Sequence, residues 1–162
     1  MKIFFARHAD AIDHLTETVK SDALRYLTET GRKKENEVAD YLKEYFKDLD
    51  MIYTSPLIRA VQTAEIIAAK TGYTGNIGLV NELKSETPVS GAVELIRVSG
   101  SFSAVLFVGH EPKLGILLNA LTGKTLTNSF SKSGISLTEF LPDNDTFRFE
   151  WYFDPKKMIF IR

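Results

Sequence analysis

Two of the three histidines stand directly after short apolar runs, where their side chains can converge. Arg7 and His8 follow the run Ile3–Ala6, and His110 follows the run AVLFVG at 104–109. A short continuous apolar run ended by polar residues is typical of a buried strand. In open sheets covered by helices, ligands bind beyond the carboxyl ends of the strands. We therefore expect Arg7, His8 and His110 to meet at one edge of a sheet.

A second arginine completes a set of groups suited to an oxyanion. Arg59 lies one helical turn into the segment SPLIRAVQTAEIIAAKTG at 55–72, which follows a further predicted strand at 51–54. Arginine presents a fixed fork of donors that matches phosphate oxygens, and a neutral imidazole either donates a hydrogen bond or attacks phosphorus. Nearby positive charge disfavours the imidazolium form and keeps a histidine neutral near pH 7. The combination predicts a phosphate site, to which helix N-termini near Ser55 and Pro112 would add partial positive charge.

Each of these residues also has a purely structural interpretation. Arg7 alone could pair with one of the 21 acids, and an isolated histidine is more often a satisfied structural residue than a catalytic one. Arg59 alone could lie on the solvated face of a helix. Glu82 follows a third predicted strand but is one acid among many. Their joint arrangement at the ends of predicted strands favours a functional site over these separate structural interpretations.

The elements that position these residues alternate between strands and helices. Helical spacing and capping residues indicate a helix opened by LTETG, with Thr28 or Thr30 as its cap and an amphipathic stretch at 35–46. Ser55 is predicted to cap the helix of 55–72, and Gly72 to end it. The remaining expected elements are strands at 77–80, 135–141, 146–153 and 158–161, and helices at 92–98 and 114–121.

This alternation predicts one α/β domain spanning residues 1–162, a three-layer αβα sandwich with a mostly parallel central sheet. The strand-rich tail would add antiparallel strands at one edge. The chain has 44% hydrophobic and 25% charged residues, as in ordinary globular proteins, and its formal charge of −1 gives no reason to expect nucleic acid or an acidic membrane as partner. It has no cysteine and no evident signal peptide or membrane span, so we expect a cytoplasmic protein without disulfides.

Three blocks of the sequence resemble a known family. RHADA at 7–11 is similar to the RHG signature of the histidine phosphatase superfamily, which includes the phosphoglycerate mutases. YTSPLIRAVQTAEII at 53–67 resembles its second block, SPxxRAxQTA, and VGHEP at 108–112 resembles the block with its second histidine. RHADA, the LTxxG helix start and the chain length are most similar to the SixA-type phosphohistidine phosphatases. The resemblance covers residues 2 to about 115, while the tail matches only loosely.

The resemblance implies a role for each matching residue. His8 would be the nucleophile that becomes phosphorylated, and Arg7, Arg59 and His110 would bind the phosphoryl oxygens. Glu82 falls where the family often places its proton donor, with Asp13 and Glu111 as the alternatives. Ala9 replaces the glycine of RHG, which narrows the allowed backbone conformations but leaves its N–H free in principle to contact phosphate.

The resemblance also implies a phosphoglycerate mutase-like fold without a large cap insertion, and a phosphatase that needs no metal or other cofactor. With an open site, its expected substrate is phosphohistidine on a protein. A small phosphomonoester, hydrolysed or transferred by a mutase reaction, is the first alternative. A phosphate- or phosphoprotein-binding module without catalysis is the second. A metal hydrolase using His8, His14 and His110 fits less well, because two arginines would crowd the cation.

Overall fold

A seven-stranded sheet forms the centre of the computed structural model, which describes residues 1–13, 19–125 and 129–162. The strand order is β3-β2-β4-β1-β5-β6-β7. The strands β3, β2, β4 and β1 run parallel, and β5, β6 and β7 are antiparallel. The strands are β1 (Lys2–Arg7), β2 (Met51–Thr54), β3 (Ile77–Leu79), β4 (Ala104–Gly109), β5 (Ile135–Leu141), β6 (Thr146–Asp154) and β7 (Ile159–Ile161). The expected mixed sheet, mostly parallel with an antiparallel edge, is confirmed.

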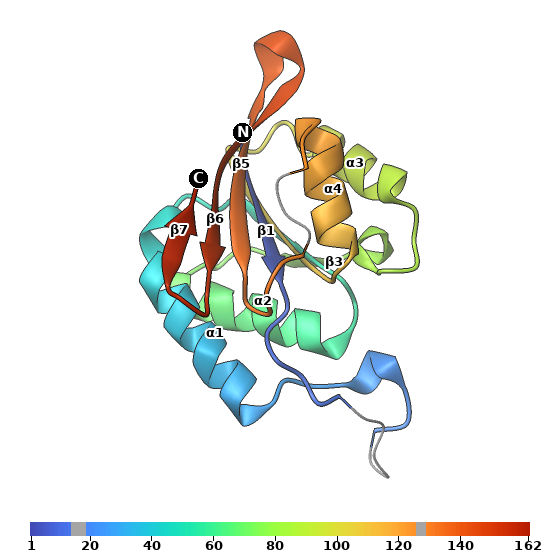
Figure 1. The fold of residues 1–162 in the computed structure, drawn as a ribbon, viewed down its shortest axis with the longest axis vertical. Coiled ribbons are helices and arrows are strands. Elements are labelled where there is room, and N and C mark those ends of the chain that lie inside the picture. Colours follow the sequence, from blue (N-terminus) through green and yellow to red (C-terminus); the bar gives the residue numbers. More distant parts are fainter. Residues whose placement is uncertain (14–18, 126–128) are drawn as a thin grey trace.

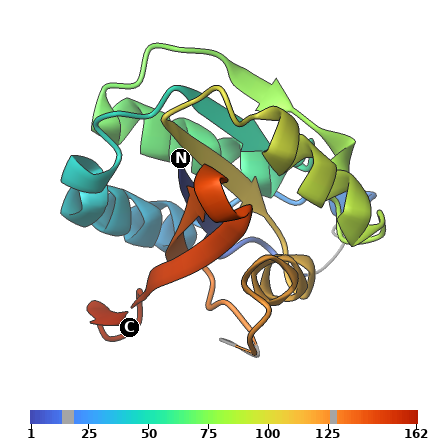
Figure 2. The ribbon, with the colours of Figure 1, turned by 90° about the horizontal axis from the view of Figure 1, so that it is seen from above.

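Within the described ranges, four α-helices cover the two faces of this sheet, which gives the expected three layers (Figures 1 and 2). They are α1 (Glu29–Leu42), α2 (Ile58–Thr71), α3 (Val89–Val98) and α4 (Lys113–Thr122). Strand β1 shows how the layers arise, because side chains alternate along a strand. Phe4 packs in the cluster of α1 and α2, whereas Phe5 packs in the cluster of α3 and α4. Among the described residues, no helix is long and apolar enough to cross a membrane.

Short 3-10 helices lie in the connections. They are η1 (Asp22–Leu24), η2 (Lys43–Tyr45), η3 (Asn81–Leu83) and η4 (Pro142–Asn144). The amphipathic stretch expected at 35–46 begins earlier, at Glu29, and passes into η2 after Leu42. The cap predicted at Thr28 is confirmed, because its hydroxyl accepts a hydrogen bond from the Gly31 amide at 2.9 Å.

The first turn of α1 packs closely against the segment that follows β1. A Cβ on Gly31 would lie 2.1 Å from the Asp10 carbonyl oxygen, so only glycine allows this approach. The Thr28 hydroxyl donates to Asp10 Oδ2 at 2.8 Å, and the Thr28 amide donates to the Asp10 carbonyl at 3.0 Å. One turn further along, Glu35 is completely buried, with Ser133 as the polar side chain beside it. The start of α1 is therefore fixed to the chain segment that carries His8.

Candidate active site

The carboxyl ends of β1, β2 and β4 bring the predicted residues to one edge of the sheet (Figure 1). Backbone hydrogen bonds continue just past the strand ends, from the His8 amide to the Gly109 carbonyl at 3.1 Å and from the Ser55 amide to the Val108 carbonyl at 3.0 Å. The segments that begin at His8, Ser55 and His110 are therefore held side by side. His8, Arg59 and His110 are all buried, with at most 7% of each residue exposed.

The hydrogen bonds of His8 define which nitrogen can react. His8 Nδ1 lies 2.7 Å from the Ala9 carbonyl oxygen. A carbonyl only accepts hydrogen bonds, so Nδ1 carries the ring proton in the neutral imidazole. The lone pair is then on Nε2, which accepts a hydrogen bond from Arg59 Nε at 3.3 Å. His8 Nε2 is therefore oriented as a nucleophile beside an arginine.

The surroundings of His8 also favour its neutral form. Burial of the ring, reinforced by the positive charges of Arg59 and Arg7, lowers the pKa of His8 to about 4, although the hydrogen bond to Ala9 acts in the opposite direction. A neutral imidazole has the free lone pair that attack on phosphorus needs. His8 therefore carries that lone pair throughout the neutral pH range.

His110 lies against His8, with ring centroids 5.0 Å apart. Its Nε2 is 2.9 Å from the Ser55 hydroxyl, and its Nδ1 is buried with no hydrogen-bond partner among the described residues. Burial, together with the charges of His8 and Arg59, lowers the pKa of His110 to about 3. If the Ser55 hydroxyl donates to Nε2, then Nδ1 carries the proton and is available to donate to a bound oxyanion.

Ser55 therefore has a different role from the predicted helix cap. α2 begins at Ile58 after Leu57, whose side chain provides no capping hydrogen bond. The Ser55 hydroxyl lies 3.5 Å from the Leu57 amide, a far weaker contact than the one with His110. The predicted cap at Ser55 was wrong because α2 begins only at Ile58, and the Ser55 hydroxyl instead makes its shorter contact with His110, 55 residues further along the chain.

Arg59 is held by Asp22, an acid that the sequence analysis did not single out. Its Nη2 donates to Asp22 Oδ2 at 2.9 Å, and its Nη1 donates to the Asp22 carbonyl at 2.8 Å. Partial burial raises the pKa of Asp22, but hydrogen bonds from Arg25 and Arg59 outweigh this effect and hold it below its usual value. The Asp22 carboxylate therefore forms an ion pair with the guanidinium that is predicted to bind phosphate. No spacing in the sequence relates Asp22 to Arg59.

Arg7 contacts the segment that leads into β5. Its Nη1 donates to the Phe130 carbonyl at 2.5 Å, while its buried Nε has no hydrogen-bond partner among the described residues. The positive charge of Arg7 lowers the pKa of both His8 and His110, so the guanidinium lies within electrostatic reach of the two rings. Arg7 retains an unused donor at the edge of the candidate site.

The Ala9 amide is engaged within the protein. It donates to Thr63 Oγ1 at 3.1 Å, and the Thr63 hydroxyl donates to the Arg59 carbonyl at 2.7 Å. The sequence left a phosphate contact by this N–H open, and in the structure the amide is bonded to Thr63 instead. Thr63 was overlooked as a site residue, although it lies one helical turn after Arg59 in the quoted QTA block.

No hydrogen bond or ion pair joins the three candidate proton donors to His8 within the described residues. Glu82 is exposed in η3, and no hydrogen bond or ion pair joins its carboxylate to the other candidate residues within the described ranges. Asp13 is exposed and pairs with Arg25 at 3.4 Å and Lys132 at 3.9 Å. Burial raises the pKa of the Glu111 carboxyl, whose Oε1 accepts a hydrogen bond from the Gly115 amide at 3.1 Å. The assignment of the donor stays a prediction.

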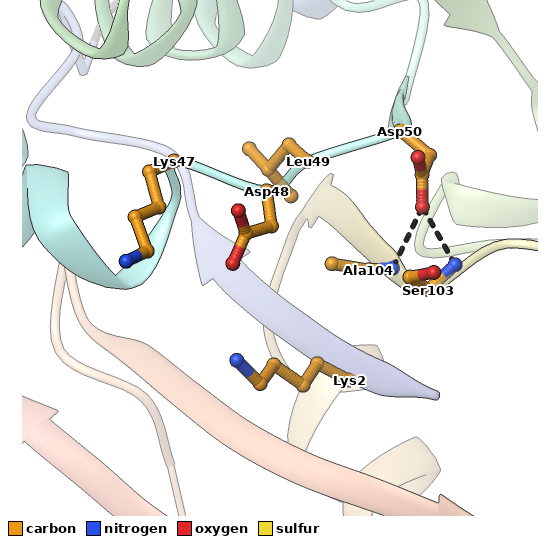
Figure 3. Close-up of a pocket in the computed structure, with 7 residues that line it drawn as sticks. All are labelled: Lys2, Lys47, Asp48, Leu49, Asp50, Ser103 and Ala104. Carbon is orange, nitrogen blue, oxygen red and sulfur yellow. Dashed lines mark hydrogen bonds between the residues drawn. The ribbon is translucent and has the colours of Figure 1, made fainter.

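The opposite edge of the sheet has a pocket of about 600 Å³ that contains none of the predicted residues (Figure 3). Asp50 lies in it and accepts hydrogen bonds from the amides of Ser103 at 2.6 Å and Ala104 at 3.0 Å, which caps the start of β4. No group of three His, Asp or Glu suited to a metal ion occurs among the described residues. His14, which the metal-hydrolase alternative requires, lies outside them.

Comparisons with known proteins agree with this geometry. The model of the histidine phosphatase superfamily (branch 1) matches residues 3–84. The chain is 27% identical to phosphohistidine phosphatase SixA of Escherichia coli (strain K12), over 96% of this chain and 94% of that protein. It is 41% identical to an uncharacterized protein of Picosynechococcus sp. (strain ATCC 27264 / PCC 7002 / PR-6), over 83% of this chain and 82% of that protein.

Solved structures show the same fold. The structure of a protein histidine phosphatase SixA complexed with tungstate superposes with a TM-score of 0.87 at 25% identity, covering 98% of this chain and all of that chain. A SixA structure from Agrobacterium tumefaciens gives a TM-score of 0.80 at 22% identity, covering 93% and 96% of the two chains. The predicted phosphoglycerate mutase-like architecture is confirmed over nearly the full length.

Proposed function

On the premise that this chain belongs to the histidine phosphatase superfamily (branch 1), we propose that it is a phosphatase that removes phosphate from phosphohistidine on a protein. The observation that carries the proposal is the orientation of His8. Its Nδ1–H bond to the Ala9 carbonyl leaves the lone pair on Nε2, and Arg59 Nε lies 3.3 Å from that atom. Similarity to SixA supports the choice of phosphohistidine as substrate.

The proposed reaction has two displacement steps. In the first, the His8 Nε2 lone pair forms a bond to phosphorus, and the bond from phosphorus to the substrate imidazole breaks. The leaving imidazole keeps that electron pair and takes a proton from solvent. In the second, a water oxygen bonds to phosphorus, the bond to His8 breaks, and phosphate leaves with a proton lost to solvent. Arg7, Arg59 and His110 would stabilise the charge on the phosphoryl oxygens in both steps.

The requirement for an acid differs between phosphohistidine and an alkyl phosphate as substrate. An alkoxide needs a proton from a well-placed acid as it leaves, whereas imidazole is a far better leaving group. Asp22 is held ionised by two arginines, and Glu82 makes no contact with His8 among the described residues. Glu82 would then assist as donor only with ester substrates.

Trapping the phosphorylated enzyme tests this proposal. The protein is incubated in excess EDTA with a histidine-phosphorylated protein, or separately with p-nitrophenyl phosphate, and quenched with alkali. We expect base-stable, acid-labile phosphate on the wild type, and none on the variant His8→Asn. His14→Asn serves as the matched control and should still be labelled.

The outcome separates the proposal from its alternatives. Faster labelling from p-nitrophenyl phosphate would favour a small-ester phosphatase of the same family. Absence of label and of phosphate release with both donors would refute catalysis through His8. Loss of activity in EDTA alone would instead restore the metal-hydrolase alternative.

A further inference from the structure

A second pocket adjoins the candidate active site through Arg7. It has a volume of about 520 Å³ and is lined by Arg7, Ser129, Phe130, Ser131, Lys132 and Lys156. These residues come from the end of β1, the segment before β5 and the turn between β6 and β7. β5 runs antiparallel to β1, so it begins where β1 ends. β6 is antiparallel to β5 and β7 to β6, so the turn between β6 and β7 lies at the same edge of the sheet (Figure 1). We call this the Lys156 pocket.

The wall of the Lys156 pocket is fixed to the strand that carries His8. The Phe130 carbonyl accepts a hydrogen bond from Arg7 Nη1 at 2.5 Å, and the Ser131 amide donates to the Tyr152 hydroxyl at 2.8 Å. The next turn is equally constrained, because a Cβ on Gly134 would lie 2.4 Å from that same hydroxyl. The pocket therefore keeps a defined position relative to His8.

The charge of the pocket is positive. Arg7, Lys132 and Lys156 contribute to its lining, and no carboxylate does so among the described residues. Lys132 is neutralised in part by Asp10, whose Oδ1 lies 2.5 Å from Lys132 Nζ. Lys156 has no ion pair within the described ranges, and the buried Nε of Arg7 has no partner there. The whole chain has a formal charge of −1, so this positive character is local.

We propose that the Lys156 pocket binds a carboxylate of the substrate, carried by an acidic residue next to the phosphohistidine. The inference rests on the proposed function and adds a preference among its substrates. Arg7 would lie between the phosphoryl group and the acidic residue, and Lys156 would face the carboxylate from the β6–β7 turn. Lysine and arginine are the natural partners of a carboxylate, and an exposed lysine contributes modestly and in a salt-dependent way.

Matched phosphohistidine peptides test the inference. One peptide carries aspartate on both sides of the phosphohistidine, and the other carries the isosteric asparagine. At low salt we expect wild-type kcat/KM to be roughly fivefold higher for the aspartate peptide. Lys156→Gln should abolish this ratio, whereas Lys157→Gln, which alters an exposed neighbour outside the pocket lining, should preserve it. Lys156→Glu should shift the preference toward a lysine-flanked peptide.

The results distinguish failure of the pocket from failure of the proposed function. Equal rates for the two peptides, or a full preference retained in Lys156→Gln, would overturn the role of the pocket alone. No phosphate release from either peptide would overturn the proposed function, and the inference with it. Phosphoserine and phosphoethanolamine, which differ by one carboxylate, form the second arm. A Lys156-dependent preference found only there would also overturn the proposal, because the pocket would then bind the carboxylate of a small ester and not that of an acidic residue beside phosphohistidine.

Discussion

The first quantity to measure is the protonation of His8 as pH falls. Burial and two neighbouring arginines lower its pKa from 6.5 to about 4. This difference of roughly 2.5 pH units corresponds to about 3 kcal/mol disfavouring the imidazolium form. At pH 5.5 an ordinary histidine is about 10% neutral, whereas His8 should be about 97% neutral. His8 should therefore stay neutral at a pH at which an unperturbed imidazole is mostly protonated.

Two measurements check this expectation without involving a substrate that itself titrates. Carbon-detected NMR of the histidine rings, assigned with single Asn variants, gives the midpoint for His8 directly. The rate of acylation of His8 by diethylpyrocarbonate, followed by mass spectrometry, reports its neutral fraction. Between pH 7.5 and 5.5 this rate should change little for His8, while free N-acetylhistidine should lose about nine tenths of its rate.

The variant Arg59→Met separates the causes of the shift. Burial is the largest cause and the charge of Arg59 a smaller one, so the variant should raise the pKa of His8 only part of the way back to 6.5. A midpoint near 6.5 in the wild type would refute the argument from burial. A return to about 6.5 in Arg59→Met would show that charge, and not burial, controls His8.

Two further predictions concern acids next to the site. Asp22→Asn removes the negative charge that contacts Arg59, so inorganic phosphate should inhibit up to about fivefold more tightly at low salt. The control Asp48→Asn, at the opposite edge of the sheet, should leave phosphate inhibition unchanged. Weaker inhibition in Asp22→Asn would show that Asp22 mainly orients Arg59. Burial raises the pKa of Glu35 from 4.5 to about 7. Between these two pH values the folded state keeps a proton that the unfolded state releases, so the free energy of unfolding of the wild type falls as the pH rises from 4.5 to 7. The free energy of unfolding of Glu35→Gln minus that of the wild type, from urea titrations, should therefore rise by about 3 kcal/mol between pH 4.5 and 7.5, and a difference independent of pH would contradict this.

Local patterns in the sequence predicted the strands that carry the site. The apolar runs before Arg7 and His110 are buried strands in the structure, and the strand predicted at 51–54 has the expected bounds. These predictions succeeded because burial and strand ends leave a signature within a few neighbouring residues. The left-handed glycines that end α2 and α4, Gly72 and Gly123, were recognisable for the same reason.

The partners of the site residues were beyond the reach of local patterns. Asp22 and Arg59 are 37 residues apart, and no local pattern marks this acid among the others. Ser55 was predicted as a helix cap from its neighbours, but α2 begins only at Ile58, and the contact of the Ser55 hydroxyl with His110 joins positions 55 residues apart. A hydrogen bond between distant segments depends on the three-dimensional arrangement, which spacing along the chain does not encode.

The reversal of direction at β5 has a consequence for how substrate choice can change. Because β5 starts where β1 ends, a tail outside the recognisable motifs lies beside His8. Under the proposed function, the parallel half of the sheet would carry the reacting groups, and the antiparallel half would carry the surface that meets the rest of the substrate. Mutations in the antiparallel half would then alter which molecules are accepted while the reacting groups stay in place. Reaction and substrate choice would thus evolve separately within one small domain.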